Sequence, residues 1–129
     1  MSQFGLKKNE RLKSKKDISS LFTEQQFVFQ YPIKLFYRIT DCESSHKILF
    51  SVSVSKKNIR QANKRNLIKR RIRENYRLNK NGFKFLDAEN KQLQLMFLYI
   101  AKDVVDYNTI NKTIIKHAKL LKKKIDIVE

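Results

Sequence analysis

The sequence is short of the residues that interrupt or cross-link a chain. Its 129 residues include two glycines, one proline, one cysteine and no tryptophan. With Cys42 as the single thiol, the chain forms no internal disulfide and has no second thiol for a zinc site. So few glycines and prolines, together with 41% hydrophobic residues, argue against a low-complexity disordered chain. We therefore expect one compact domain over residues 1–129.

Acidic residues and long apolar runs are also scarce. Only 12 Asp and Glu stand against 29 Lys and Arg, which leaves a formal charge of +17 spread along the chain. No stretch approaches the roughly 20 apolar residues of a membrane-spanning helix, and the basic residues 1–13 lack the apolar core of a secretory signal. We expect a mobile basic segment there, in a soluble cytoplasmic protein with no membrane contact. The charge favours a polyanionic partner.

The sequence also lacks a recognisable catalytic constellation. His46 falls in a polar stretch and His117 in a helical pattern, and neither has a metal-ligand spacing. The acidic residues are scattered, and there is no glycine-rich phosphate loop. We predict no catalytic residue, no metal-ligating residue and no cofactor bound tightly by the protein. An independent two-metal nuclease is therefore disfavoured.

The dominant feature is a basic run from Val54 to Leu78, which holds ten Lys or Arg residues and one acid, Glu74. Its second part, from about Asn63, predicts a helix with a cationic face. The opposite, apolar face is formed by Leu67, Ile68, Ile72, Tyr76 and Leu78. Phosphate groups would relieve the repulsion among the cations, so we predict nucleic-acid binding here. The candidate residues are Lys56, Lys57, Arg60, Lys64, Arg65, Asn66, Lys69, Arg70, Arg73 and Arg77.

The other periodicities predict an α, β, β, β, α, β, α order. Ser14 and Asp17 have the spacing of a helix N-terminus, and β-branched and aromatic residues indicate the strands. Helices are expected over residues 14–23 and 107–124, with one interrupted or two short strands over 26–40 and further strands over 48–55 and 93–101. This order is typical of an α/β two-layer sandwich whose helices cover one side of the sheet.

A second polar surface is predicted on the sheet. In two of the strands the residues of one face are Lys34, Phe36, Arg38, Ser51, Ser53 and Ser55. Aromatic, hydroxyl and cationic groups together suit a single strand of RNA, because bases stack and phosphates are neutralised. Alternatively, Phe36 and Phe22 complete the core beneath the first helix, and the pattern does not decide between the two. The lysines of the last helix are expected on a solvated outer face.

Three segments carry a family resemblance. SVSKK from Ser53, followed by KRNLIKRRIRE from Lys64 to Glu74, resembles the protein component of bacterial ribonuclease P, and RLKSKKDISSLF from Arg11 to Phe22 is similar to the first helix of that family. Leu67 departs from the family's Arg-Asn-Arg triplet, of which Arg65 and Asn66 are kept. Ile18 stands where the family often has Phe, and Phe36 where it often has Tyr.

The resemblance implies the fold of a small-subunit ribosomal protein domain, with a left-handed βαβ crossover. It implies a subunit, one per RNA, that joins a catalytic RNA holding the active site and its magnesium ions and assists removal of the 5′ leader from precursor tRNA. The basic helix would contact the catalytic RNA, and a cleft between the first helix and the sheet would receive the leader. Its residues are Arg11, Ile18, Phe22, Lys34, Phe36, Arg38, Ser51, Ser53 and Ser55. The alternative is a structural RNA-binding protein, ribosomal or assembly, with no role in cleavage.

Overall fold

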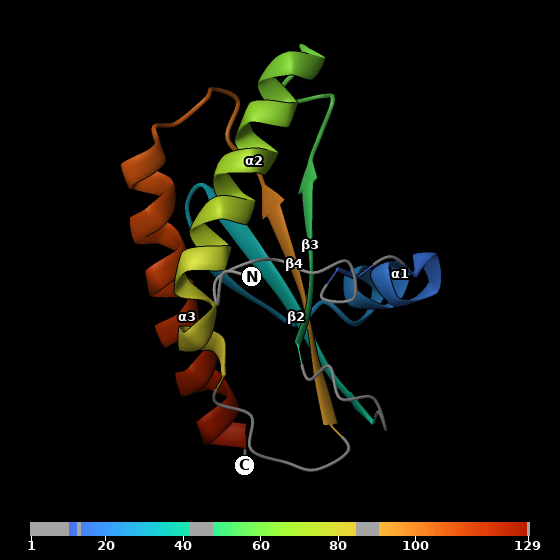
Figure 1. Ribbon diagram of the computed structural model, residues 1–129. Helices are drawn as coiled ribbons and strands as arrows, with labels where there is room; N and C mark the ends of the chain where they lie inside the picture. The colour runs from blue at the N-terminus through green and yellow to red at the C-terminus, as the bar shows by residue number, and fades with distance from the viewer. Residues whose placement is uncertain (1–10, 13, 42–47, 85–90, 129) are drawn as a thin grey trace, which may run out of the picture.

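The computed structural model describes residues 11–12, 14–41, 48–84 and 91–128, and these form a four-stranded sheet with helices on both faces (Figure 1). The elements are α1 (Lys15–Glu24), β1 (Phe27–Gln30), β2 (Ile33–Asp41), β3 (Ile48–Val54), α2 (Ala62–Asn79), the 3-10 helix η2 (Lys80–Phe83), β4 (Lys91–Tyr99) and α3 (Tyr107–Val128). The predicted order is confirmed, with two strands on either side of Pro32. The last helix is longer than predicted.

The strand order in the sheet is β1-β2-β4-β3. β1 pairs with β2 and β2 with β4 in antiparallel fashion, whereas β3 and β4 are parallel. β4 therefore has a neighbour on each side, and residues 92–97 are all buried. This position explains the nearly continuous apolar run of β4, because helices or loops cover both of its faces.

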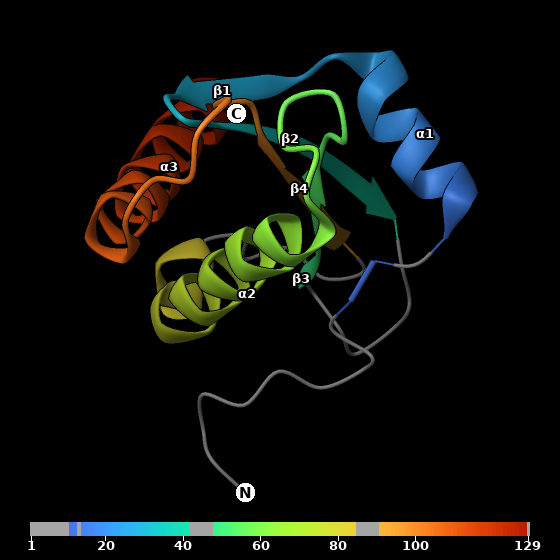
Figure 2. The ribbon, with the colours of Figure 1, turned by 90° about the horizontal axis from the view of Figure 1, so that it is seen from above.

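The connection from β3 through α2 to β4 is a left-handed crossover. In Figure 1, β3 and β4 both point upward, α2 lies in front of them, and β4 stands to the left of β3. Figure 2 shows α2 and α3 together on this side of the sheet. The hand is the one that the family resemblance implied, and it is opposite to that of about 98% of parallel crossovers.

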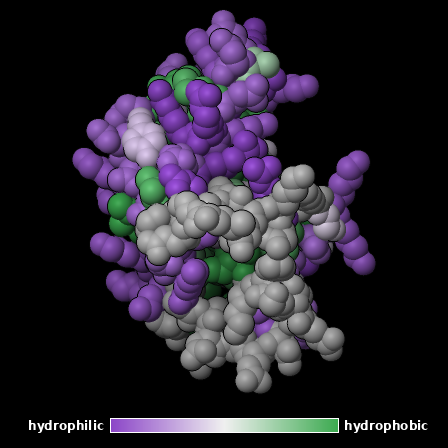
Figure 3. All heavy atoms as spheres, in the orientation of Figure 1, coloured by the Kyte–Doolittle hydropathy of each residue, from purple (hydrophilic) through white to green (hydrophobic). Residues whose placement is uncertain are grey.

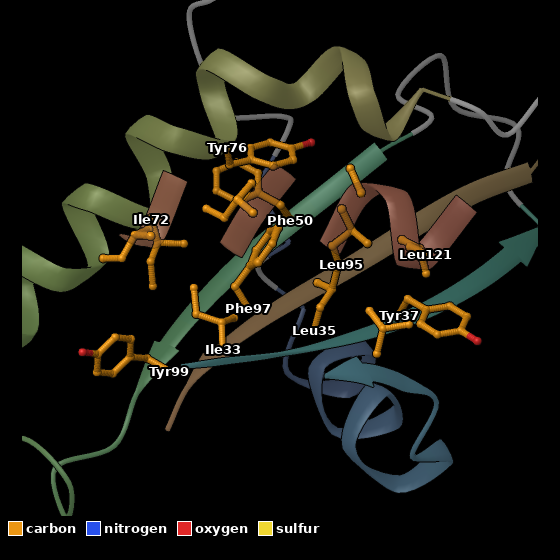
Figure 4. Close-up of a cluster of buried hydrophobic side chains, with 14 of the residues drawn as sticks. Ile33, Leu35, Tyr37, Phe50, Ile72, Tyr76, Leu95, Phe97, Tyr99 and Leu121 are labelled. Carbon is orange, nitrogen blue, oxygen red and sulfur yellow. The ribbon is translucent and has the colours of Figure 1, made fainter. Parts of the chain in front are cut away.

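The main core fills the space between the sheet and the helices α2 and α3 (Figure 4). Tyr76 of α2 is buried in this core, stacked on Phe50 at a centroid distance of 4.5 Å and in contact with Phe83 and Phe97. The helical apolar face was predicted correctly for Ile68, Ile72 and Tyr76. Leu78 was predicted wrongly, because it is 44% exposed in the last turn of α2.

Helix α1 corrects the expectation that all helices lie on one side of the sheet. It packs on the opposite face from α2 and α3 (Figure 2), where Leu21 forms a small second core with Leu12, Phe36 and Met96. The predicted N-terminus is confirmed, since the side chain of Ser14 accepts a hydrogen bond from the backbone N–H of Asp17 at 3.3 Å. The sheet thus has apolar side chains on both faces and two separate cores.

Some predictions fall on residues outside the described ranges. These are the mobile segment, of which residues 1–10 are not described, and the polar stretch around Cys42 and His46. In the ranges that are described, no helix is both long enough and apolar enough to span a bilayer.

Candidate nucleic-acid interface

The first candidate surface begins where β3 ends. The backbone N–H of Lys57 donates to the side chain of Ser55 at 3.1 Å, and the N–H of Ile59 donates to the carbonyl of Ser55 at 3.0 Å. Because Ile59 is buried, these bonds hold a tight turn that leaves Lys56 and Lys57 exposed. Ser55 therefore shapes the turn at the end of β3, and it does not line the sheet-face cleft described below.

The cationic face of α2 is open to solvent along its first half. Figure 3 shows hydrophilic side chains gathered over the upper end of α2 and the loop before it. We call this the basic surface, and its members, exposed except for half-buried Lys69, are Lys56, Lys57, Arg60, Lys64, Asn66, Lys69 and Arg70. Leu67, at the position of the triplet's second arginine, is half-buried beside them.

Three arginines of the run have partners within the protein. Arg65 donates from Nη1 to the carbonyl oxygens of Ile59 and Arg60, at 2.9 and 2.8 Å, and so fixes the loop to the start of α2. Arg71, which the helical wheel did not select, donates to the carbonyl of Val105 at 2.9 Å and links α2 to the segment before α3.

Arg77 pairs with Glu74, with Nε and Oε2 3.1 Å apart. The bond raises the pKa of Arg77 and lowers the pKa of Glu74. Glu74 thereby offsets part of the positive charge near the C-terminal end of α2.

The second candidate surface is a cleft of about 450 Å³ between α1, β3 and α2, which we call the α1 cleft. Of the predicted residues it brings together Arg11, Ile18, Phe22, Ser51 and Ser53. Its floor is apolar, and Ser51 bonds with the carbonyl of Leu95 at 3.4 Å and the sulfur of Met96 at 3.3 Å. None of its described lining residues is acidic.

Arg73 also lines this cleft, although it was predicted to lie on the cationic face of the basic helix that contacts the catalytic RNA. Burial, and in second place the nearby charge of Arg11, lower the pKa of Arg73. Two guanidinium groups thus approach each other where water is partly excluded. An anion between them would offset both the repulsion and the lost hydration.

Phe36 and Arg38 lie next to the cleft but have structural partners. Phe36 is 6% exposed and packs against Phe22 and Phe27 at centroid distances of 5.0 and 5.6 Å. Of the two roles considered for Phe36, the structure thus favours completing the core beneath α1. Arg38 donates to Asp17 at 2.9 Å and to Gln94 at 3.2 Å, and lies 3.6 Å from Glu24. It joins α1 to the sheet.

Lys34 lies one row further along the sheet than Phe36. Its ammonium group stands 4.3 Å from the ring centroid of Phe27 and 5.7 Å from that of Phe36. The structure therefore places Lys34 outside the cleft lining but on the same sheet face.

No three His, Cys, Asp or Glu side chains of the described residues come together in a way that could hold a metal ion.

Comparisons with known proteins identify the family of the chain. The family model described as Ribonuclease P matches residues 6–125. The chain belongs to the ribonuclease P protein family. It is 35% identical over 117 residues to the ribonuclease P protein component of Porphyromonas gingivalis, which covers 88% of this chain and 83% of that protein.

Solved ribonuclease P proteins share the fold. The protein from Thermotoga maritima matches with a TM-score of 0.65 and 23% identity, over 88% of this chain and 96% of that one. The protein from Staphylococcus aureus matches with a TM-score of 0.63 and 24% identity, over 88% and 95% of the two chains. These structures confirm the mixed α/β fold. The family model and the 35% identical relative confirm the ribonuclease P assignment.

Proposed function

We propose that this chain is the protein subunit of a ribonuclease P ribonucleoprotein, binding the catalytic RNA through the basic surface and the 5′ leader of precursor tRNA through the α1 cleft. The observation that carries the proposal is the α1 cleft itself, an apolar groove with two arginines that opens beside the basic helix in a member of this family. One protein would act with one RNA, in the cytoplasm.

The chemistry of the α1 cleft suits one unpaired RNA strand. The ring of Phe22, 37% exposed, offers a stacking surface for a base. Arg11 and Arg73 can each bind a phosphate in bidentate fashion. The hydroxyls of Ser51 and Ser53 suit the 2′-OH groups or base edges that distinguish RNA. A mature tRNA has no leader to place there, so the cleft would favour the precursor.

The RNA would carry the active site and hold the magnesium ions. The protein would contribute position and charge, because its cations reduce the repulsion between catalytic RNA and substrate and release condensed counterions from both. The basic surface, whose lysines and arginines are exposed apart from half-buried Lys69, is suited to this role.

Reconstitution tests the proposal. Purified protein alone should cleave nothing, whereas protein added to its RNA should lower the salt needed to cleave precursor tRNA, and the complex should bind precursor more tightly than mature tRNA. Cleavage that survives digestion of the RNA would overturn the RNA-based mechanism. Equal affinity for precursor and mature tRNA would instead favour the structural RNA-binding alternative.

A further inference from the structure

The open part of the sheet face beside α1 carries a row of four residues, one from each strand. The register aligns Phe29 of β1 with Lys34 of β2, Lys34 with Leu98 of β4, and Leu98 with Ser53 of β3. Paired residues of neighbouring strands project from the same face. Leu98 also packs against the second core, so this is the face that α1 occupies. We call these four residues the outer row.

The outer row is accessible along its whole length. α1 packs on the adjacent row, in which Phe36 contacts Phe22 and Met96 is buried. In the outer row Ser53, Leu98 and Lys34 are only half-buried, and Phe29 at the sheet edge is 49% exposed. A single exposed Phe needs no explanation. The informative observation is that Phe29 ends a continuous row rather than standing alone.

The outer row is also continuous with the α1 cleft, because Ser53 belongs to both. A strand leaving the cleft at Ser53 would cross Leu98, an apolar surface, then Lys34, and reach the ring of Phe29. With strands about 4.8 Å apart, this path is about 14 Å long. Lys34 has no carboxylate partner among the described residues. Its ammonium group lies over the rings of Phe27 and Phe36, and a cation on aromatic faces can still bind a phosphate.

We propose that the outer row extends the α1 cleft and binds the distal part of a long leader, with one base stacked on Phe29 and one phosphate near Lys34. The occupant is a single RNA strand, because an exposed aromatic ring and a cation on an open sheet face offer such a strand base stacking and phosphate neutralisation. The inference rests on the proposed function, and it adds a site that distinguishes long leaders from short ones.

The test uses the holoenzyme reconstituted from the full chain and its RNA. Its substrates are precursor tRNAs with leaders of about four or about ten nucleotides, within the range of single-strand site sizes. Phe29→Leu keeps an apolar side chain but removes the ring. It should weaken binding of the long-leader substrate about tenfold, the loss of one stacked base, and leave the short-leader substrate unchanged. Phe29→Tyr should bind like the unmodified protein.

Tyr31 supplies the matched control. It is 58% exposed in the turn after β1, outside the outer row, and its carbonyl accepts from Thr113 of α3. Tyr31→Leu should change neither affinity. If Phe29→Leu weakens both substrates equally, or neither, the outer row is not a leader site. If the unmodified holoenzyme does not prefer precursor over mature tRNA, the proposed function itself fails.

A second measurement avoids substitution altogether. A photoreactive base near the 5′ end of the long leader should crosslink to the peptide that contains residues 27–34 of the unmodified protein. Crosslinks confined to α1, or absent from the protein, would overturn the proposal.

Discussion

Arg38 of β2 donates a hydrogen bond to Asp17 of α1 across 2.9 Å, and this contact joins one wall of the α1 cleft to the sheet. Both side chains are largely shielded, with 18% and 32% of their surfaces exposed. The main role of Arg38 is therefore to hold α1 in position. The sequence predicted a phosphate contact for this arginine on the polar face of its strand, whereas the structure gives it two carboxylate neighbours, Asp17 and Glu24.

Arg38→Gln and Asp17→Asn should have similar effects. Each should lower the free energy of unfolding by about 1 kcal/mol, as for a partly shielded ion pair. Each should also weaken leader binding, because α1 is held less firmly. Urea unfolding and precursor tRNA affinity measure the two effects. Should Asp17→Asn leave leader binding intact while Arg38→Gln reduces it, Arg38 binds RNA directly.

Arg70 and Arg73 should affect different RNAs. Arg70 is exposed on the basic surface, so Arg70→Ala should lower the affinity for the catalytic RNA and reduce the slope of log affinity against log salt by about 0.9. Arg73 lines the α1 cleft, so Arg73→Ala should mainly reduce the preference for precursor over mature tRNA. Salt titrations with each RNA separate the two. An identical response of both variants would show one shared interface.

Phe36→Ala should destabilise the fold, and Phe22→Ala should mainly weaken leader binding. Phe36 is nearly buried between two aromatic rings, and its truncation should cost about 3–4 kcal/mol. Phe22 is partly open to the cleft, so its truncation should lower the free energy of unfolding by a smaller amount. Chemical denaturation and leader affinity check the pair. If the Phe36→Ala protein is stable but binds the leader weakly, Phe36 contacts the leader directly.

His117 should make stability depend on pH. It is fully buried in α3, and neither ring nitrogen has a hydrogen-bond partner within the described chain. Burial lowers the pKa of His117 from 6.5 to about 4, while the nearby carbonyls of Ile33 and Gln30 oppose the shift. Between these values the unfolded chain binds a proton that the folded protein excludes. The free energy of unfolding should therefore fall as pH decreases through this window, by about 3 kcal/mol in all.

Urea unfolding at neutral pH and near pH 4 checks this dependence. His117→Leu should flatten the pH dependence across that window. An unchanged slope in the His117→Leu protein would assign the effect to other groups.

Local patterns were sufficient for the elements of the fold. The alternation of Phe50, Val52 and Val54 with serines predicted β3, and the spacing of Ile68, Ile72 and Tyr76 predicted the buried face of α2. Periodicity says which side of an element is apolar but not which face of the sheet receives it. The side of the sheet that α1 occupies therefore came only from the structure.

The site residues were harder to predict wherever a partner is distant in the sequence. Arg38 meets Asp17, which is 21 residues away, and Arg71 meets Val105, which is 34 residues away. A helical wheel places Arg73 with its neighbours but cannot show that β3 and Arg11 lie beside it. Phe29 was passed over because an isolated aromatic in a short strand predicts only a strand, and its significance depends on the register of all four strands.

β3 contributes to both candidate surfaces. Its outer side chains Ser51 and Ser53 line the α1 cleft, and its last residue leads directly into the turn that exposes Lys56 and Lys57. On the proposed function, a leader in the cleft and an RNA on the basic surface would be held at a set separation and angle by one hydrogen-bonded strand. Their reaction would then proceed at the effective concentration of a single molecule, without a hinge or a closing loop.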